Sequence, residues 1–117
     1  MRILIAERDP VWQRRWREAG VPGELEIASD GAEALRAAFR DPPAAVVCEA
    51  LLPGLDGLAV VRRLREHPLT RHVPVAVVSA LPFEDRAREA GADLYRQKPL
   101  SDADLAALVA ALTAPHP

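Results

Sequence analysis

Five short runs of mostly apolar residues alternate along the chain with segments of helical hydrophobic period, and this alternation limits the folds open to the sequence. The runs are Arg2–Ala6, Leu25–Ala28, Ala44–Cys48, Val75–Ser79 and Leu94–Gln97. Short apolar runs are typical of parallel strands that are buried on both faces. Strands alternating with helices form one sheet with helices on both faces, because the crossovers are right-handed. We therefore predict an α/β fold with a doubly wound, five-stranded parallel sheet.

The segments between the runs carry signals for helix starts. Asp9 followed by Pro10 combines a favoured N-cap residue with a proline that suits the first helical turn. Asp30 with Glu33 resembles a capping box, and Ser101 caps the last helix. These signals fall between the strands, as the alternation requires.

Composition indicates one small domain with an aliphatic core. The chain has 117 residues, 50% hydrophobic but only 4% aromatic, so Ala, Val and Leu must fill the interior. We assign residues 1–113 to the domain and 114–117 to a Pro-rich tail. The one cysteine, Cys48, lies in an apolar run, which predicts a buried, reduced thiol. No apolar stretch approaches the roughly 20 residues of a membrane helix, and the sequence starts directly with a strand, so we expect a cytoplasmic protein.

The net charge of −2 weighs against binding to nucleic acid or to an anionic membrane. Basic clusters in two predicted helices argue the other way, and they are Arg14, Arg15 and Arg17, then Arg62, Arg63 and Arg65. These helices should cover opposite faces of the sheet, so the clusters cannot merge into one basic patch. We predict solvated helix faces, with no nucleic-acid or membrane partner.

The tryptophans and histidines give little sign of a site. Trp12 and Trp16 share the apolar stripe of the first helix, so we expect both in the core. Trp12 also lies about one turn from Arg8, close to the candidate pocket described below. The three histidines lack metal-ligand spacing and are expected on the surface or in loops: His67, His72 and His116.

The residues that follow the strands are the candidates for a functional site. In doubly wound sheets, ligands bind outside the carboxyl ends of the strands. The residues placed there are mostly polar, and they are Glu7, Arg8, Asp9, Glu49, Ser79, Lys98 and Pro99. Lys98 is the only lysine among the 15 Lys and Arg residues, so this place has a compact ammonium where the rest of the chain has guanidinium groups. Asp9 is better explained as the helix N-cap.

Five stretches of the sequence together resemble a known family. They are Ile3–Pro10, Ala28–Leu35, Leu52–Gly57, Val73–Ala80 and Ala90–Pro99. In this order and spacing they are similar to the receiver domains of response regulators, over essentially the whole chain. The resemblance implies that family's flavodoxin-like (βα)5 fold. The helices after Pro10 and over Pro82–Ala90 are each about one turn shorter than the family's.

The resemblance also implies a phosphoryl-transfer chemistry. In the family, an aspartate at the end of strand three accepts a phosphoryl group. Two acids after strand one hold a Mg²⁺ ion, which bridges this aspartate and the phosphoryl oxygens. A hydroxyl at the end of strand four and a lysine after strand five bind the phosphoryl oxygens. An aromatic residue on strand five responds to the movement of that hydroxyl. Ser79 matches the hydroxyl, Lys98 the lysine and Tyr95 the aromatic residue. Pro99 follows the lysine in a bond that the family makes cis.

Three positions depart from the family's pattern. Glu49 stands at the acceptor position, Glu7 at the first acid, and Arg8 at the second, where a permanent cation replaces a metal ligand. We therefore expect weak or no Mg²⁺ binding, no other cofactor and no catalytic residue. One hypothesis is a permanent ion pair between Glu49 and Lys98. Another is that Arg8 pairs with Glu7 or Glu49 in place of the metal, the alternative being that Arg8 turns outward to solvent.

By this resemblance, the substitutions are expected to keep the scaffold and to remove the family's chemistry. The resemblance then implies a degenerate pseudo-receiver, which acts as a phosphorylation-independent protein–protein interaction module in two-component-type signalling and not as an enzyme. Two alternatives stay open: a functional receiver that accepts phosphate by an altered route, and a sensor that binds an anion or small ligand with Arg8, Ser79 and Lys98. The protein partner is not identified by the sequence. Family habit places contacts, including those of a homodimer, on the last two helices and strand five with Tyr95 and Arg96.

Overall fold

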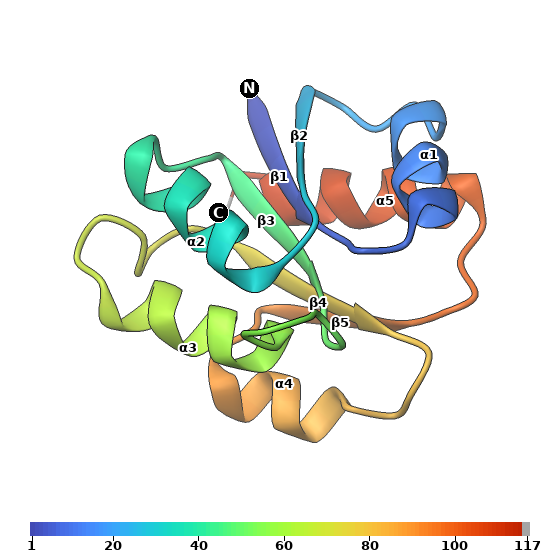
Figure 1. Cartoon of the computed structure of the whole chain (residues 1–117). Coiled ribbons are helices and arrows are strands. Elements are labelled where there is room, and N and C mark those ends of the chain that lie inside the picture. The colour runs from blue at the N-terminus through green and yellow to red at the C-terminus, as the bar shows by residue number, and fades with distance from the viewer. Residues whose placement is uncertain (116–117) are drawn as a thin grey trace.

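A computed structural model of the chain, which describes residues 1–115, contains a single five-stranded parallel sheet (Figure 1). Its strands are β1 (Arg2–Ala6), β2 (Glu24–Ala28), β3 (Ala45–Glu49), β4 (Val75–Ser79) and β5 (Leu94–Gln97), in the order β2-β1-β3-β4-β5. The helices are α1 (Pro10–Glu18), α2 (Gly31–Arg40), α3 (Gly57–Glu66), α4 (Glu84–Ala90) and α5 (Asp102–Thr113). The predicted α/β fold is confirmed.

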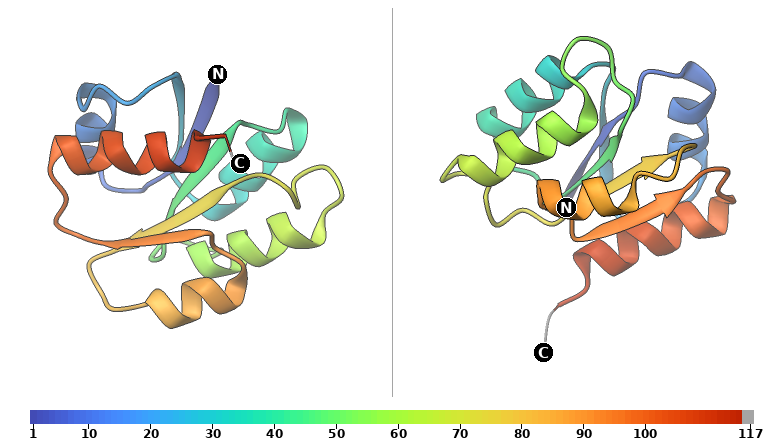
Figure 2. Two further views of the ribbon diagram at one scale, coloured as in Figure 1. Left: turned by 180° about the vertical axis from the view of Figure 1, so that it is seen from behind. Right: turned by 90° about the horizontal axis from the view of Figure 1, so that it is seen from below.

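The helices cover both faces of the sheet, with α1 and α5 on one face and α2, α3 and α4 on the other (Figure 2). Successive side chains of a strand point to opposite faces, so each strand contributes to two separate cores. Leu4 and Ala6 pack with α2, α3 and α4, whereas Ile3 and Ile5 pack with α1 and α5. Both cores consist mainly of Ala, Val, Ile and Leu side chains, as the composition predicts.

The helix starts follow the predicted caps, with two differences. Asp9 accepts a hydrogen bond from Val11 N at 2.9 Å. Asp30 accepts from Glu33 N at 2.8 Å, but the Glu33 carboxylate accepts from Ser29 N, one residue before the usual partner in a capping box. The α4 helix begins at Glu84, later than the predicted Pro82, and its N-cap residue makes no side-chain hydrogen bond.

The last helix has the complete reciprocal box between Ser101 and Asp104. Hydrogen bonds from the backbone and then the side chain of Ser101 lower the pKa of Asp104. A cap that the sequence reading missed is Asp56, which accepts from Ala59 N at 2.9 Å and starts α3.

Gly57 brings the start of α3 against the end of β3. A Cβ added at Gly57 would lie 2.0 Å from the carbonyl oxygen of Glu49, so only glycine allows this approach. The Gly57 N–H donates to the carbonyl of Ala50 at 2.9 Å. The backbone around Glu49 is therefore fixed from the side of α3.

Arg65 on α3 ties together the loops at the amino ends of β4 and β5. Its guanidinium donates to the carbonyls of Gly91, Arg71 and Val73 at 2.9, 3.0 and 2.6 Å. It also pairs with Asp93 at 2.9 Å. One planar group with five donors thus satisfies acceptors from two different loops.

The tryptophan prediction is half wrong. Trp16 is 1% exposed and belongs to the core between α1, α5 and the sheet. Trp12 is only partly buried, because it lies in the first turn of α1 and lines the candidate site. Its ring contacts the edge of this core and is not enclosed by it.

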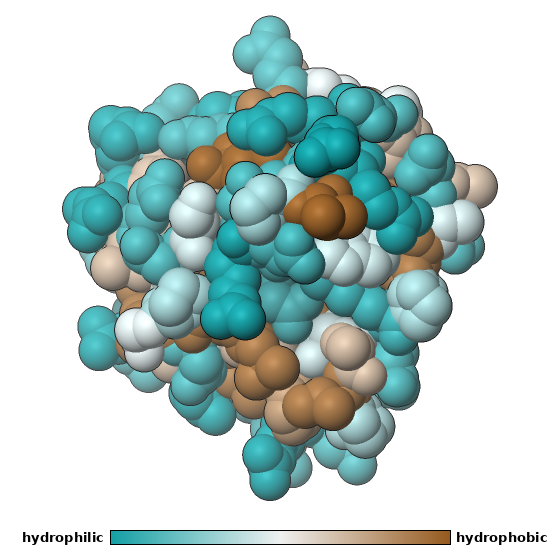
Figure 3. All heavy atoms as spheres, turned by 45° about the vertical axis from the view of Figure 1, so that its right-hand side comes forward, coloured by the Kyte–Doolittle hydropathy of each residue, from teal (hydrophilic) through white to brown (hydrophobic). Residues whose placement is uncertain are grey.

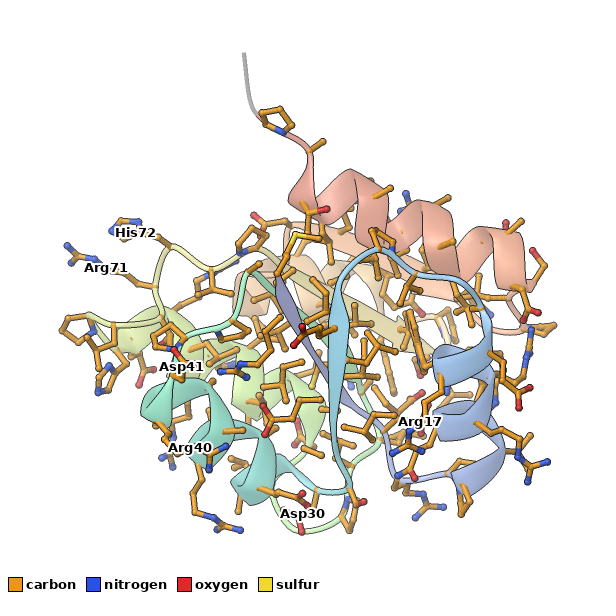
Figure 4. All side chains as sticks on the ribbon, turned by 90° about the horizontal axis from the view of Figure 1, so that it is seen from above. Arg17, Asp30, Arg40, Asp41, Arg71 and His72 are labelled. Carbon is orange, nitrogen blue, oxygen red and sulfur yellow. The ribbon has the colours of Figure 1, made fainter. Side chains whose placement is uncertain are left out.

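The exposed basic and histidine side chains lie on several sides of the molecule. Arg71 and His72 point away from the body of the molecule, and Arg17 lies on α1 at the other side (Figure 4). His67 stacks on Phe39, with ring centroids 4.4 Å apart. His116 and Pro117, the last two residues of the predicted tail 114–117, lie outside the described residues. Within residues 1–115, none of the helices has the length and hydrophobicity needed to cross a membrane.

Candidate functional site

The carboxyl ends of β1, β3, β4 and β5 bring four predicted polar residues into one buried cluster. Glu7, Glu49 and Ser79 are 2%, 6% and 0% exposed, and the Lys98 side chain is 9% exposed. Charged side chains are rarely buried unless they are paired. Their burial at neighbouring strand ends therefore implies contacts among them.

The Lys98 ammonium contacts both glutamates. Its Nζ lies 2.5 Å from Glu7 Oε1 and 2.6 Å from Glu49 Oε2. The other oxygen of Glu7 accepts from Asp9 N at 3.1 Å, and the other oxygen of Glu49 accepts from Leu51 N at 3.2 Å. Each carboxylate oxygen thus already has a partner. The predicted Glu49–Lys98 pair is present, whereas the sharing of Lys98 with Glu7 was not predicted.

Arg8 does not make the predicted pair with Glu7 or Glu49. Among the ion pairs of residues 1–115 it has no partner, and its side chain is exposed at the rim of the site. Lys98 already contacts both glutamates, and their remaining carboxylate oxygens accept from backbone N–H groups. The solvent-facing alternative for Arg8 is therefore the one found.

Trp12 forms a wall of the site. The Lys98 Nζ lies 4.4 Å from the centroid of the Trp12 ring, and the Arg15 Cζ lies 4.3 Å from it. Both distances are within the range of a cation–π interaction. Arg15 also donates to the carbonyl of Leu100 and lies 3.6 Å from Asp102. This part of the site was missed, because the helical period of α1 assigned Trp12 to the core.

A shallow cavity of about 200 Å³ lies over the cluster. The residues that line it are Glu7, Arg8, Asp9, Trp12, Glu49, Leu51, Ala80 and Lys98. Leu51, which lines it, is an exposed apolar residue, and Figure 3 shows hydrophobic residues among hydrophilic ones on the face that it brings forward. The mouth of the cavity is therefore mixed in polarity.

A larger cavity of about 540 Å³ lies at the amino ends of β4 and β5, away from these residues. Arg65 and Asp93 line it, but they bind each other and nearby backbone groups. Arg71 and His72, which also line this cavity, are exposed, and Arg71 donates to His72 at 3.2 Å. The carboxyl edge, where buried charges converge, is the better candidate for a functional site.

Ser79 and Tyr95 both hold the loop between β4 and α4. Ser79 Oγ accepts from Leu81 N at 3.2 Å. The Tyr95 hydroxyl donates to the carbonyl of Leu81 and accepts from Phe83 N at 3.1 Å. Tyr95 is 6% exposed, so it packs inward and is not a surface anchor. Neither residue touches the ammonium of Lys98, although Lys98 N donates to the Ser79 carbonyl at 2.8 Å.

Two further strand-end residues have clear geometry. The peptide bond between Lys98 and Pro99 is cis. Cys48, next to Glu49, is completely buried, and this burial, with the Glu49 carboxylate as a smaller cause, raises the pKa of the Cys48 thiol far above its ordinary value. A thiol in such surroundings is not a nucleophile.

The donor set does not fit Mg²⁺, which prefers near-octahedral oxygen ligands. Glu7 and Glu49 are held by Lys98, and Arg8 lines the same cavity. In the part of the chain that the structure describes, no group of three or more His, Cys, Asp or Glu side chains is placed to hold a metal ion. We therefore assign no reaction step to a metal here.

Comparison with known proteins identifies the family. Residues 3–110 match the model of the response regulator receiver domain. The transcriptional regulatory protein PrrA of Mycobacterium tuberculosis is 47% identical over 118 residues, covering 95% of this chain and 49% of PrrA. Response regulator PleD of Caulobacter vibrioides is 41% identical over 93 residues, covering 77% of this chain and 20% of PleD.

Solved structures agree with this relationship. A putative response regulator from Chloroflexus aurantiacus superposes with a TM-score of 0.84 and 31% identity, covering 97% of this chain and 98% of that one. The chain spans about half of PrrA and about a fifth of PleD. On these grounds the chain belongs to the response regulator receiver domain family of two-component signalling.

Proposed function

We propose that this receiver domain works without phosphorylation, as a protein–protein interaction module. The observation that supports this most is the position of the Lys98 ammonium, 2.5 Å from Glu7 and 2.6 Å from Glu49. A phosphoryl group and a metal ion would need the same carboxylate oxygens and the same ammonium. Side chains of the domain already satisfy these groups, so the site has little to gain from either ligand.

The residue types support the same proposal. Glu49 carries its carboxylate one methylene farther out than an aspartate would, and this carboxylate contacts Lys98. Arg8 keeps its charge at any ordinary pH and lines the mouth of the cavity. A divalent cation approaching Glu7 and Glu49 would meet this charge first. We therefore propose that the pocket is degenerate and performs no catalysis.

A fixed site would give the domain one fixed binding surface. Tyr95 is buried, and its hydroxyl holds the backbone of Leu81 and Phe83 in the loop before α4. Such a loop has no need of a phosphoryl group to order it. We propose that protein partners read this constant surface, with α4, β5 and α5 as the contact region for a partner or for a second copy of the chain.

The experiment that tests this proposal is a backbone amide NMR titration with Mg²⁺ and then beryllofluoride, a stable stand-in for the phosphoryl group. We expect no saturable shift at Arg8, Glu49, Ser79 or Lys98 up to about 10 mM Mg²⁺, because Lys98 already occupies both carboxylates and Arg8 lines the cavity. The matched control is the double variant Arg8→Asp and Glu49→Asp, which gives the cavity a second acid and a shorter acceptor. This variant should bind both ligands.

Each contrary outcome has a distinct meaning. Saturable shifts of the unmodified chain with Mg²⁺ and beryllofluoride, extending to Tyr95, would show a receiver that accepts phosphate by an altered route. Shifts with inorganic phosphate or sulfate alone would show an anion sensor. Either result would overturn the proposal.

A further inference from the structure

We propose that Trp12 is a positioning residue, which holds the Lys98 ammonium on Glu7 and Glu49 and closes one side of the pocket. The inference deepens the proposed function, on which it rests, because it names what keeps the charged cluster in one arrangement. It concerns a residue outside the set of strand-end positions that define the site.

The ammonium of Lys98 is surrounded by three groups. Two are the carboxylates of Glu7 and Glu49, at 2.5 and 2.6 Å, and the third is the Trp12 ring, with its centroid at 4.4 Å. The lysine stem is flexible, so the carboxylates alone do not define its path. The ring occupies the side on which water would otherwise reach the ammonium, and only 9% of the Lys98 side chain is exposed.

Arg15 keeps the ring in this place. Its guanidinium lies over Trp12 with Cζ 4.3 Å from the centroid, so the indole contacts two cations. Arg15 also donates to the carbonyl of Leu100 and lies 3.6 Å from Asp102. These contacts join α1 to the segment that directly follows Lys98. The position of α1 relative to Lys98 is therefore fixed.

Core packing alone does not account for a tryptophan at this position. The core on this face already contains Trp16, which is 1% exposed and lies one turn farther along α1. Trp12 remains partly exposed, and its contacts include the two cations. An aliphatic residue would fill the same space against the core but would attract neither Lys98 nor Arg15.

The test uses the fact that Lys98 is the only lysine of the chain. Acetylation with acetic anhydride, followed by peptide mass spectrometry, measures the reactivity of this one side chain apart from the amino terminus. We expect Trp12→Leu to raise the acetylation rate of Lys98 about tenfold, because a shielded cation–π contact is lost. Trp12→Phe, which keeps an aromatic face, should restore most of the protection. Val11→Ala, an exposed change on the same helix, is the control and should leave the rate unchanged.

A spectroscopic measurement distinguishes the loss of the Trp12 contact with Lys98 from a general destabilisation of the domain. In chain labelled with ¹³C-lysine, the single Cε signal and its protons should show an upfield ring-current shift, which Trp12→Leu removes. Arg15→Gln keeps the Trp12 ring but removes the guanidinium that connects it to Leu100. This variant should reduce both the ring-current shift of Lys98 and its protection from acetylation. An unchanged Lys98 rate and shift in both variants would overturn the inference.

The two proposals can fail separately. Mg²⁺ and beryllofluoride binding by the unmodified chain would overturn phosphorylation independence, while the acetylation rates would still report on Trp12. Conversely, a chain that binds neither ligand but whose Lys98 is equally reactive with and without Trp12 would keep the proposed function and remove the role of Trp12.

Discussion

Lys98 is one positive charge in contact with two buried carboxylates, so the three charged residues of the cluster are not equivalent. Without the Glu49 charge, Glu7 and Lys98 would remain as a neutral pair. Without the Lys98 charge, two carboxylates would face each other in a place that is almost closed to water. The penalty for an unpaired buried charge is usually larger than the gain from a paired one.

We therefore predict an asymmetry between two substitutions. Glu49→Gln should lower the free energy of unfolding by about 1 kcal/mol, since one charge-assisted hydrogen bond is lost but the remaining pair is neutral. Lys98→Met should lower it by about 3–5 kcal/mol, because both carboxylates lose their counter-ion. Urea unfolding measures both values. Equal losses, or a smaller loss for Lys98→Met, would contradict the prediction. Such a result would mean that solvent reaches Glu7 and Glu49 and stabilises their charges when Lys98 is absent.

At the scale of elements, the ends of helices and strands are fixed by single polar groups. Asp9, Asp30, Asp56 and Ser101 each cap a helix through one side-chain oxygen. Arg65 acts at the opposite edge of the sheet, where three carbonyls and one carboxylate converge on its guanidinium. Its side chain is 22% exposed, so these acceptors are poorly compensated by water when the donor is removed.

We expect Arg65→Met to lower the free energy of unfolding by about 2 kcal/mol, because the stem still packs but the carbonyls lose their donors. Arg65→Lys should recover little, since an ammonium cannot reproduce the planar fork. The matched control is Arg63→Met, an exposed change on the same helix, which should alter stability by less than about 0.5 kcal/mol. Thermal and urea unfolding would show the difference. A control as harmful as Arg65→Met would point to helix propensity instead.

The strands and most helices were predictable because each carries its own local signal, such as a proline after Asp9 or an apolar run before Glu49. The candidate site was predictable as a set of positions, because parallel strands end at one edge. Side-chain directions were not, since they depend on packing that the pattern does not encode. The sequence indicated the pair of Glu49 with Lys98, but the outward course of Arg8 and the wall formed by Trp12 required the structure.

At the scale of the whole molecule, the sheet separates two hydrophobic cores, one on each of its faces. Cys48 lies at 0% exposure in β3, the central strand, and belongs to the core under α2, α3 and α4. The helices on that face must separate from the sheet before a reagent can reach this thiol. Cys48 is thus a natural reporter of global unfolding.

We predict that a disulfide reagent modifies Cys48 at neutral pH at least about a thousandfold more slowly than a free cysteine, in proportion to the folding equilibrium. Its raised thiol pKa slows the reaction further. The rate should increase with urea along the slope of global unfolding, and spectrophotometry follows it directly. A fast reaction that urea does not change would instead indicate local opening of β3.

The reach of Lys98 across the sheet has a mechanical consequence. Lys98 follows β5, a four-residue strand at the edge, yet its ammonium fastens onto residues at the ends of β3 and β1, beyond β4. A short edge strand with one neighbour is ordinarily the first to peel away and to pair with a foreign strand. Here the ion pairs of Lys98 connect the end of this strand to the ends of β3 and β1. We therefore expect the cluster of Glu7, Glu49 and Lys98 to protect this edge of the domain against strand exchange and aggregation.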